Sequence, residues 1–238
     1  MKQIQVKGVI IPNDDKWFYD WLEMDATAPK DIVLPETGED VEVLINSPGG
    51  NVYAGSEIYT ALRSYSGHVH VKIVGIAASA ASVIAMAGAH VEISPTAQIM
   101  IHNVSSGAYG DHKSHIHEAE ILEGLNESIA SSYMAKTGKS LNELLELMEQ
   151  ETWFTAEKAV EHGFADSVMF AKDVVPSFTA SQSSTIPSNV IEKMRAAMTP
   201  PKLDIDKLVE KVAEKLAIKE LETKEVETLN QGFGRFLF

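Results

Sequence analysis

The chain has 238 residues, no cysteine and a formal net charge of −14. The lack of cysteine excludes disulfides, thiolate metal sites and cysteine nucleophiles, and the negative charge argues against nucleic-acid binding, which needs clustered Lys and Arg. No run approaches the roughly 20 apolar residues of a membrane span, and the apolar stretch at residues 9–11 is too short for a signal-peptide core. We therefore expect a cytoplasmic protein that binds neither nucleic acid nor membrane.

The first two thirds of the chain alternate between strand and helix patterns. Period-2 and β-branched segments predict strands at residues 4–11, 41–45, 69–74, 91–93, 98–101 and 165–170. Helical spacing predicts helices at residues 17–22, 53–65, 79–89, 114–136, 141–148 and 155–162. Residues 26–40 contain two prolines and predict a loop, and Gly138 is expected to cap the long helix. The alternation up to about residue 110 predicts an α/β domain of repeated β-β-α or β-α units.

The composition changes after this domain. Residues 1–172 form the predicted domain, residues 173–202 a linker rich in Ser, Thr and Pro, and residues 203–238 an amphipathic helix with an aromatic tail. The helix either docks on its own domain or binds a partner. Both alternatives fit its apolar stripe.

Two segments bring glycine and serine to positions suited to catalysis. Residues 45–50 read Ile-Asn-Ser-Pro-Gly-Gly, and their glycines allow another chain to approach the backbone closely. In residues 75–82, Ser79 is flanked by small residues at the start of a helix, where free amides can stabilise an oxyanion. Taken singly, these segments are better explained by an ordinary turn and by a serine that caps a packed helix.

A histidine follows the apolar strand at residues 98–101. His102 can be held rigidly there and act as a general base at neutral pH, although a structural histidine is the other interpretation. His112, His115 and His117 cluster farther on, but their spacings lack supporting acids. We therefore assign no metal site and expect no cofactor.

The order and spacing of these segments resemble the proteolytic subunit of the Clp protease. The family motifs I-N-S-P-G-G, G-x-A-A-S and M-I-H stand at residues 45–50, 75–79 and 100–102, and residues 154–167 resemble a further family segment. The resemblance covers about residues 40–170 and selects Ser79 over Ser82. It implies a crotonase-like fold and a serine endopeptidase in which Ser79 is the nucleophile and His102 the general base. It further implies an oxyanion hole formed by the amides of Gly50 and Ala80.

One position departs from the family pattern. Where the family has its catalytic aspartate this chain has Thr152, with Glu151 beside it. The Thr152 hydroxyl can accept a hydrogen bond from the histidine ring but supplies no negative charge. Glu151 could take the role only in a different register.

Other features resemble the ClpP-like proteases of tailed phages and prophages, which mature phage heads. These are the opening residues 4–10, Trp17 and Trp21, the block around Thr152 and the C-terminal extension. That resemblance implies protein or peptide substrates such as capsid or scaffold precursors, in the host cytoplasm or the prohead. The resemblance to the Clp proteolytic subunit also implies rings of six or seven subunits, with a partner covering the apolar face of Ile121, Leu125 and Ile129 on the long helix. A housekeeping ClpP that works with an ATP-dependent unfoldase and a catalytically weak scaffold protein are the alternatives.

Overall fold

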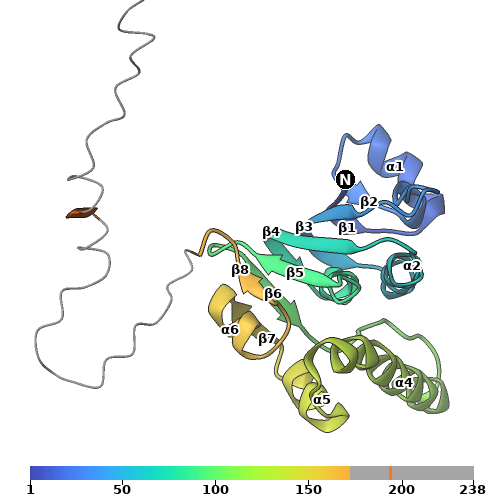
Figure 1. Cartoon of the computed structure of the whole chain (residues 1–238). Coiled ribbons are helices and arrows are strands. Elements are labelled where there is room, and N and C mark those ends of the chain that lie inside the picture. The colour runs from blue at the N-terminus through green and yellow to red at the C-terminus, as the bar shows by residue number, and fades with distance from the viewer. Residues whose placement is uncertain (172–192, 195–238) are drawn as a thin grey trace, which may run out of the picture. The chain divides into compact units, whose positions relative to one another are not determined.

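The computed structural model describes residues 1–171 and 193–194 (Figure 1). The strands are β1 (Lys2–Ile10), β2 (Ala26–Thr27), β3 (Val41–Gly50), β4 (Val69–Ala78), β5 (His90–Ile93), β6 (Gln98–Ile101), β7 (Thr152–Thr155) and β8 (Ser167–Val168). The helices are η1 (Asn13–Asp15), α1 (Lys16–Trp21), η2 (Pro29–Asp31), α2 (Val52–Arg63), α3 (Ala80–Ala85), α4 (His112–Thr137), α5 (Leu141–Glu149) and α6 (Ala156–Glu161). The linker and C-terminal helix expected at residues 173–202 and 203–238 lie outside the described residues, apart from 193–194.

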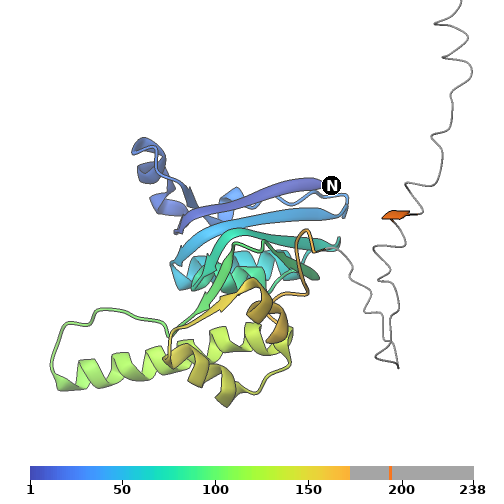
Figure 2. The same ribbon diagram turned by 90° about the vertical axis from the view of Figure 1, so that its left-hand side faces the viewer.

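The strands of the described region form one mixed sheet. Its main path runs β2-β1-β3-β4-β5-β8 with parallel pairing, and β6 pairs with both β4 and β7. Alternate residues of β3 are buried along its whole length, as expected for a strand whose side chains point to opposite faces. Figure 2 shows helices α2 and α3 packed beneath the twisted strands. This arrangement confirms the predicted α/β fold class.

Several element predictions were confirmed and others were wrong in their bounds. The predicted turn at residues 46–50 is instead the end of β3, because it pairs with β1 as far as Gly50. The predicted helix at residues 79–89 is shorter and begins at Ala80. Strand β7 was not predicted, and the strand expected at residues 165–170 is reduced to β8.

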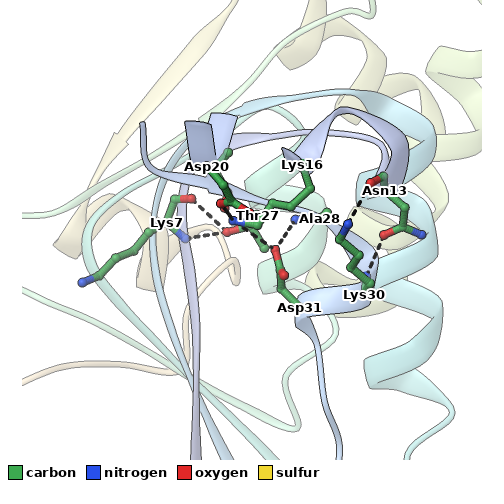
Figure 3. Close-up of polar contacts among 9 residues, drawn as sticks. Lys7, Asn13, Lys16, Asp20, Thr27, Ala28, Lys30 and Asp31 are labelled. Carbon is green, nitrogen blue, oxygen red and sulfur yellow. Dashed lines mark hydrogen bonds and ion pairs between the residues drawn. The ribbon is translucent and has the colours of Figure 1, made fainter. Parts of the chain in front are cut away.

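The segment predicted as a loop at residues 26–40 contains β2 and η2. Thr27 is buried, and its hydroxyl both accepts from the Lys7 amide (2.9 Å) and donates to the Lys7 carbonyl (2.8 Å). The Lys30 amide donates to Asn13 Oδ1 at 2.8 Å. Figure 3 shows the polar contacts that hold this segment, which involve the Lys7 backbone and the side chains of Asn13, Lys16, Asp20, Thr27, Lys30 and Asp31. They fix it against β1, which in turn supports the end of β3.

Helix α4 has 26 residues and is therefore about 39 Å long. The Asp111 side chain caps its start by accepting from the Ser114 amide, and Gly138 ends it in the left-handed conformation at φ 72°. Its buried residues, Ile129, Ala130, Ser132 and Tyr133, all lie in its C-terminal half. The N-terminal half projects beyond the sheet (Figure 2).

Among the described residues, no helix combines the length and apolar character needed to cross a bilayer.

Candidate active site

Ser79 lies in the sharp turn between β4 and α3. Its φ of 54° is in the left-handed region, which a residue with a side chain rarely adopts. Strained backbone of this kind clusters at functional sites. The turn is held on both sides: the Ser79 amide donates to the Met100 carbonyl (2.9 Å), and the Ser79 carbonyl accepts from the Ser82 amide (2.9 Å). The serine is therefore presented by a rigid backbone.

His102 directly follows β6. Because β6 pairs in parallel with β4, with Met100 opposite Ala78, the residues after these two strand ends emerge side by side. The His102 Nε2 atom lies 2.8 Å from Ser79 Oγ. A hydroxyl and an imidazole nitrogen at this distance have the geometry needed for a base to take the proton of a nucleophile.

The end of β3 packs tightly against this turn. Gly49 has a φ of +91°, and a Cβ there would lie 2.6 Å from the Ala78 carbonyl oxygen and 2.8 Å from Ser79 Cβ. The buried Ser47 hydroxyl donates to the Gly8 carbonyl (2.6 Å) and accepts from the Gly49 amide (3.1 Å). These contacts explain why glycine and serine stand in this segment.

The two residues predicted for the oxyanion hole lie on the same groove as Ser79 and His102. Gly50 ends β3, and Ala80 is the first residue of α3. The first amides of a helix have no acceptor within that helix. Both residues therefore bring backbone to the groove beside Ser79.

Ser82, the other serine of the motif, is fully buried and lies away from the groove. Its hydroxyl donates to the Ser79 carbonyl (2.6 Å) and bonds the Tyr133 hydroxyl (2.8 Å). Burial raises the pKa of Tyr133 above its ordinary range, and the hydrogen bond with Ser82 only partly offsets this. Ser82 therefore links α3 to α4 and is no rival to Ser79 as nucleophile.

Thr152 begins β7 and pairs with Ile101, the residue before His102. Its hydroxyl donates to the Leu147 carbonyl at 2.6 Å. Glu151 is exposed, and its carboxylate accepts from Trp153 Nε1 at 3.2 Å. Within the described region, the side-chain hydrogen bonds of His102 reach Ser79 but neither of these two residues.

The groove has a volume of about 540 Å³. One wall is the face of α4 that carries Ile121, Leu125 and Ile129, the residues for which a covering partner was expected. The structure directs this face toward the candidate catalytic pair. Sequence reasoning missed Glu118 and Ser106, which also line the groove. Glu118 could have been found from its spacing, because residues three and seven positions before Ile121 and Leu125 lie on the same side of a helix.

The three clustered histidines lie near the projecting end of α4 and are exposed. His117 Nδ1 lies 3.9 Å from Glu120, and the described residues contain no group of side chains suited to hold a metal ion.

Comparison with known proteins identifies the family. The sequence profile described as Clp protease matches residues 32–172. The ATP-dependent Clp protease proteolytic subunit of Bacteroides fragilis is 34% identical over 139 residues, covering 58% of this chain and 67% of that protein. Subunit 2 of Tropheryma whipplei is 30% identical over 132 residues (55% and 73%), and the Dioscorea elephantipes subunit is 36% identical over 141 residues (57% and 68%).

The fold, the groove and this match over more than half of the chain agree. The chain therefore belongs to the Clp protease family and is a serine-type peptidase.

Proposed function

We propose that the protein is an endopeptidase in which Ser79 forms an acyl-enzyme and His102 moves the proton. The observation that carries this proposal is the 2.8 Å separation of Ser79 Oγ and His102 Nε2 in a groove. Ser79 Oγ attacks the peptide carbonyl carbon while Nε2 takes its proton. The C–N bond then breaks as the imidazolium gives that proton to the leaving amine, and water, activated by the same base, hydrolyses the ester.

The amides of Gly50 and Ala80 are proposed to donate to the oxyanion of each tetrahedral intermediate. Their location on the groove beside Ser79 supports this role. Losing such donors typically costs about 100-fold or more in rate.

Thr152 is proposed to orient His102. The pairing of Ile101 with Thr152 supports this, and because the Thr152 hydroxyl donates to Leu147, its oxygen can still accept a hydrogen bond. A neutral oxygen stabilises an imidazolium less than a carboxylate does. The enzyme is therefore expected to be slower than one with an aspartate at this position.

The proposed role is maturation of phage or prophage heads, with capsid or scaffold precursors as substrates. Support comes from Thr152 in place of an acid and from the chain continuing from residue 172, where the family match ends, to residue 238. Residues 173–202 and 203–238 are proposed to be a linker and a partner-binding helix. Rings of six or seven subunits would enclose the grooves.

Two alternatives have specific support. The printed names of the relatives describe ATP-dependent Clp proteases, which favours a housekeeping subunit working with an unfoldase. Thr152 favours a weak enzyme that acts mainly as a scaffold. The first alternative predicts that a folded substrate is degraded only when an unfoldase and ATP are added.

The test is intact mass spectrometry over time for the wild type and Ser79→Ala, each incubated with an unfolded protein. Cleavage of that protein, or of the chain's own residues 177–188, by the wild type alone supports the peptidase with Ser79 as nucleophile. If neither variant cleaves anything while both form the same oligomer, the scaffold role replaces it.

A further inference from the structure

The groove beside Ser79 has apolar walls and one carboxylate. Of the described residues that line it, Glu118 is the sole acidic side chain, and none is a lysine or arginine. Glu118 is half-buried, and the Ser106 hydroxyl donates to its Oε1. Ser106 thus holds one oxygen of the carboxylate at the groove wall and leaves Oε2 to accept from another donor.

Glu118 and the apolar wall share one face of α4. Ile121, Leu122 and Leu125 follow Glu118 by three, four and seven residues, the spacing of side chains stacked along one side of a helix. Seven residues correspond to about 10 Å along the helix axis. An extended peptide covers that distance in about three residues.

The neighbouring charges do not neutralise this carboxylate. Among the described residues, the ion pairs of α4 involve His117 with Glu120 and Lys136 with Asp166, and none involves Glu118. Lys113 precedes Glu118 by five positions, which places it on a different side of the helix. The negative charge at this end of the groove is therefore available to a ligand.

We propose that Glu118 is a specificity-determining residue that binds a Lys or Arg side chain of the substrate. The basic residue lies about three positions from an apolar residue that packs against the wall containing Leu125. This inference rests on the proposed function of the groove as a peptidase site. The preferred substrate class is thus a polypeptide with an apolar residue and a basic residue at this spacing.

The experiment uses quenched fluorescent peptides that contain one Leu in a background of Ala and Ser. Lys, Gln or Glu is placed one at a time at positions two to five residues to either side of the Leu. When the test residue stands at one of these positions, the wild type is expected to cleave the Lys peptide with a kcat/KM about fivefold above that of the Gln peptide. Added salt should reduce this ratio, because the pair is partly exposed.

Glu118→Gln should bring the ratio near one, since glutamine can still accept from Ser106 but carries no charge. Glu118→Lys should invert it in favour of the Glu peptide. Glu120→Gln is the matched control: it removes the same charge from an exposed position of α4 outside the groove, so the wild-type ratio should persist.

Equal cleavage of the Lys and Gln peptides at every position, or a Lys preference that survives in Glu118→Gln, would overturn this role while leaving the peptidase intact. Cleavage of no peptide by the wild type would instead count against the proposed function. In that case the affinity of Ser79→Ala for the same labelled peptides is measured by fluorescence anisotropy. Equal affinity for the Lys and Gln peptides would overturn the role of Glu118. Tighter binding of the Lys peptide that is lost when Glu118→Gln is added to Ser79→Ala would support it.

Discussion

At the residue scale, the geometry of the proposed nucleophile, Ser79, depends on a glycine that is distant in sequence. Gly49 allows the end of β3 to lie against the turn that holds Ser79 at a φ of 54°. The strain of that turn is sustained by the hydrogen bonds of Ser79 to Met100 and Ser82. A change at Gly49 should therefore shift the position of Ser79 Oγ without contacting that oxygen directly.

Gly49→Ala is expected to lower the free energy of unfolding by about 1–3 kcal/mol and to abolish most activity. The added Cβ would meet the Ala78 carbonyl and Ser79 Cβ, and alanine is strained at a φ of +91°. Urea unfolding and labelling of Ser79 by a fluorophosphonate would measure the two effects. Gly124→Ala is the control: nothing lies within 4 Å of its Cβ, and it should stabilise α4 by about 0.5–1 kcal/mol. Normal labelling of Gly49→Ala would contradict the role of the close contact.

Thr152→Asp tests the proposed orientation of His102. If Thr152 faces the imidazole, a carboxylate there should raise kcat roughly tenfold or more, because it stabilises the imidazolium formed in the reaction. The same stabilisation should move the acid limb of the pH–rate profile to higher pH, since the base is active only when neutral. Steady-state kinetics from pH 5 to 9 would measure both.

Thr152→Val is the matched control for this substitution. It keeps the shape of the side chain but removes the oxygen, so kcat should fall below that of the wild type. If kcat is unchanged in both Thr152 variants, Thr152 does not orient His102, and its role is limited to the hydrogen bond with the Leu147 carbonyl.

At the scale of the elements, α4 has two distinct halves. Its C-terminal half is part of the core, where Tyr133 packs edge-on against Phe164 with ring centroids 5.7 Å apart. The groove wall runs from Glu118 in the N-terminal half to Ile129 in the C-terminal half. The position of the wall therefore depends on how firmly the C-terminal end of α4 is held to the sheet.

Asp166 is one of the residues that hold this end. Its carboxylate accepts from Lys136 Nζ near the end of α4 (2.6 Å) and from the Val91 amide in β5 (2.6 Å). Burial by itself raises the pKa of Asp166, but the hydrogen bonds from Lys136 and Val91 outweigh it and hold that pKa below its ordinary value. The ionised carboxylate therefore stabilises the folded state.

Asp166→Asn should lower the free energy of unfolding at pH 7 by about 1 kcal/mol, a value already reduced for solvent screening of this partly exposed pair. Because the folded pKa is depressed, this stabilisation is present above about pH 4 and is lost as the pH falls through the folded value. Thermal unfolding of both proteins at pH 7 and pH 3 should show a smaller difference at pH 3 than at pH 7. Glu143→Gln, which breaks an exposed pair with Lys139 within one turn, should have a smaller effect. An equal loss at both pH values would argue against the charge of Asp166.

At the scale of the whole molecule, one feature of the described surface favours assembly. Trp17 and Trp21 on α1 are 68% and 72% exposed, and the Phe18 ring lies between them, with centroid distances of 5.6 Å and 6.0 Å. Clustered exposed aromatic side chains are uncommon on isolated soluble proteins and mark sites of association. The net charge of −14 would keep the proposed particles apart.

The proposed assembly predicts a native mass of six or seven times the 26.0 kDa of one chain for each ring. Native mass spectrometry and light scattering over a hundredfold range of concentration would measure it. The Ser79→Ala variant should form the same particle, because its change lies in the groove. A monomer at all concentrations would contradict the ring.

The sequence alone determined the features that depend on short-range patterns. Side-chain periodicity identified the strands around residues 41–45, 69–74 and 98–101 and the long helix ending at Gly138, because burial repeats every second residue in a strand and every three to four in a helix. The sequence motifs identified Ser79 and His102 as candidates, and in the structure Ser79 Oγ lies 2.8 Å from His102 Nε2.

The tertiary structure decided what depends on partners distant in the chain. Residues 46–50 continue β3 because β1 pairs with them, although Pro, Gly and Gly predict a turn locally. Strand β7 likewise depends on its pairing with β6, a strand about 50 residues earlier in the chain. The partner of the Thr152 hydroxyl, the Leu147 carbonyl, was also visible only in the structure. The apolar face of α4 lines the groove, with Glu118 at the same wall, because the packing of the C-terminal half of α4 orients the whole helix. Hydrophobic periodicity shows that a helix has an apolar face, but only long-range contacts determine which part of the molecule that face lies against.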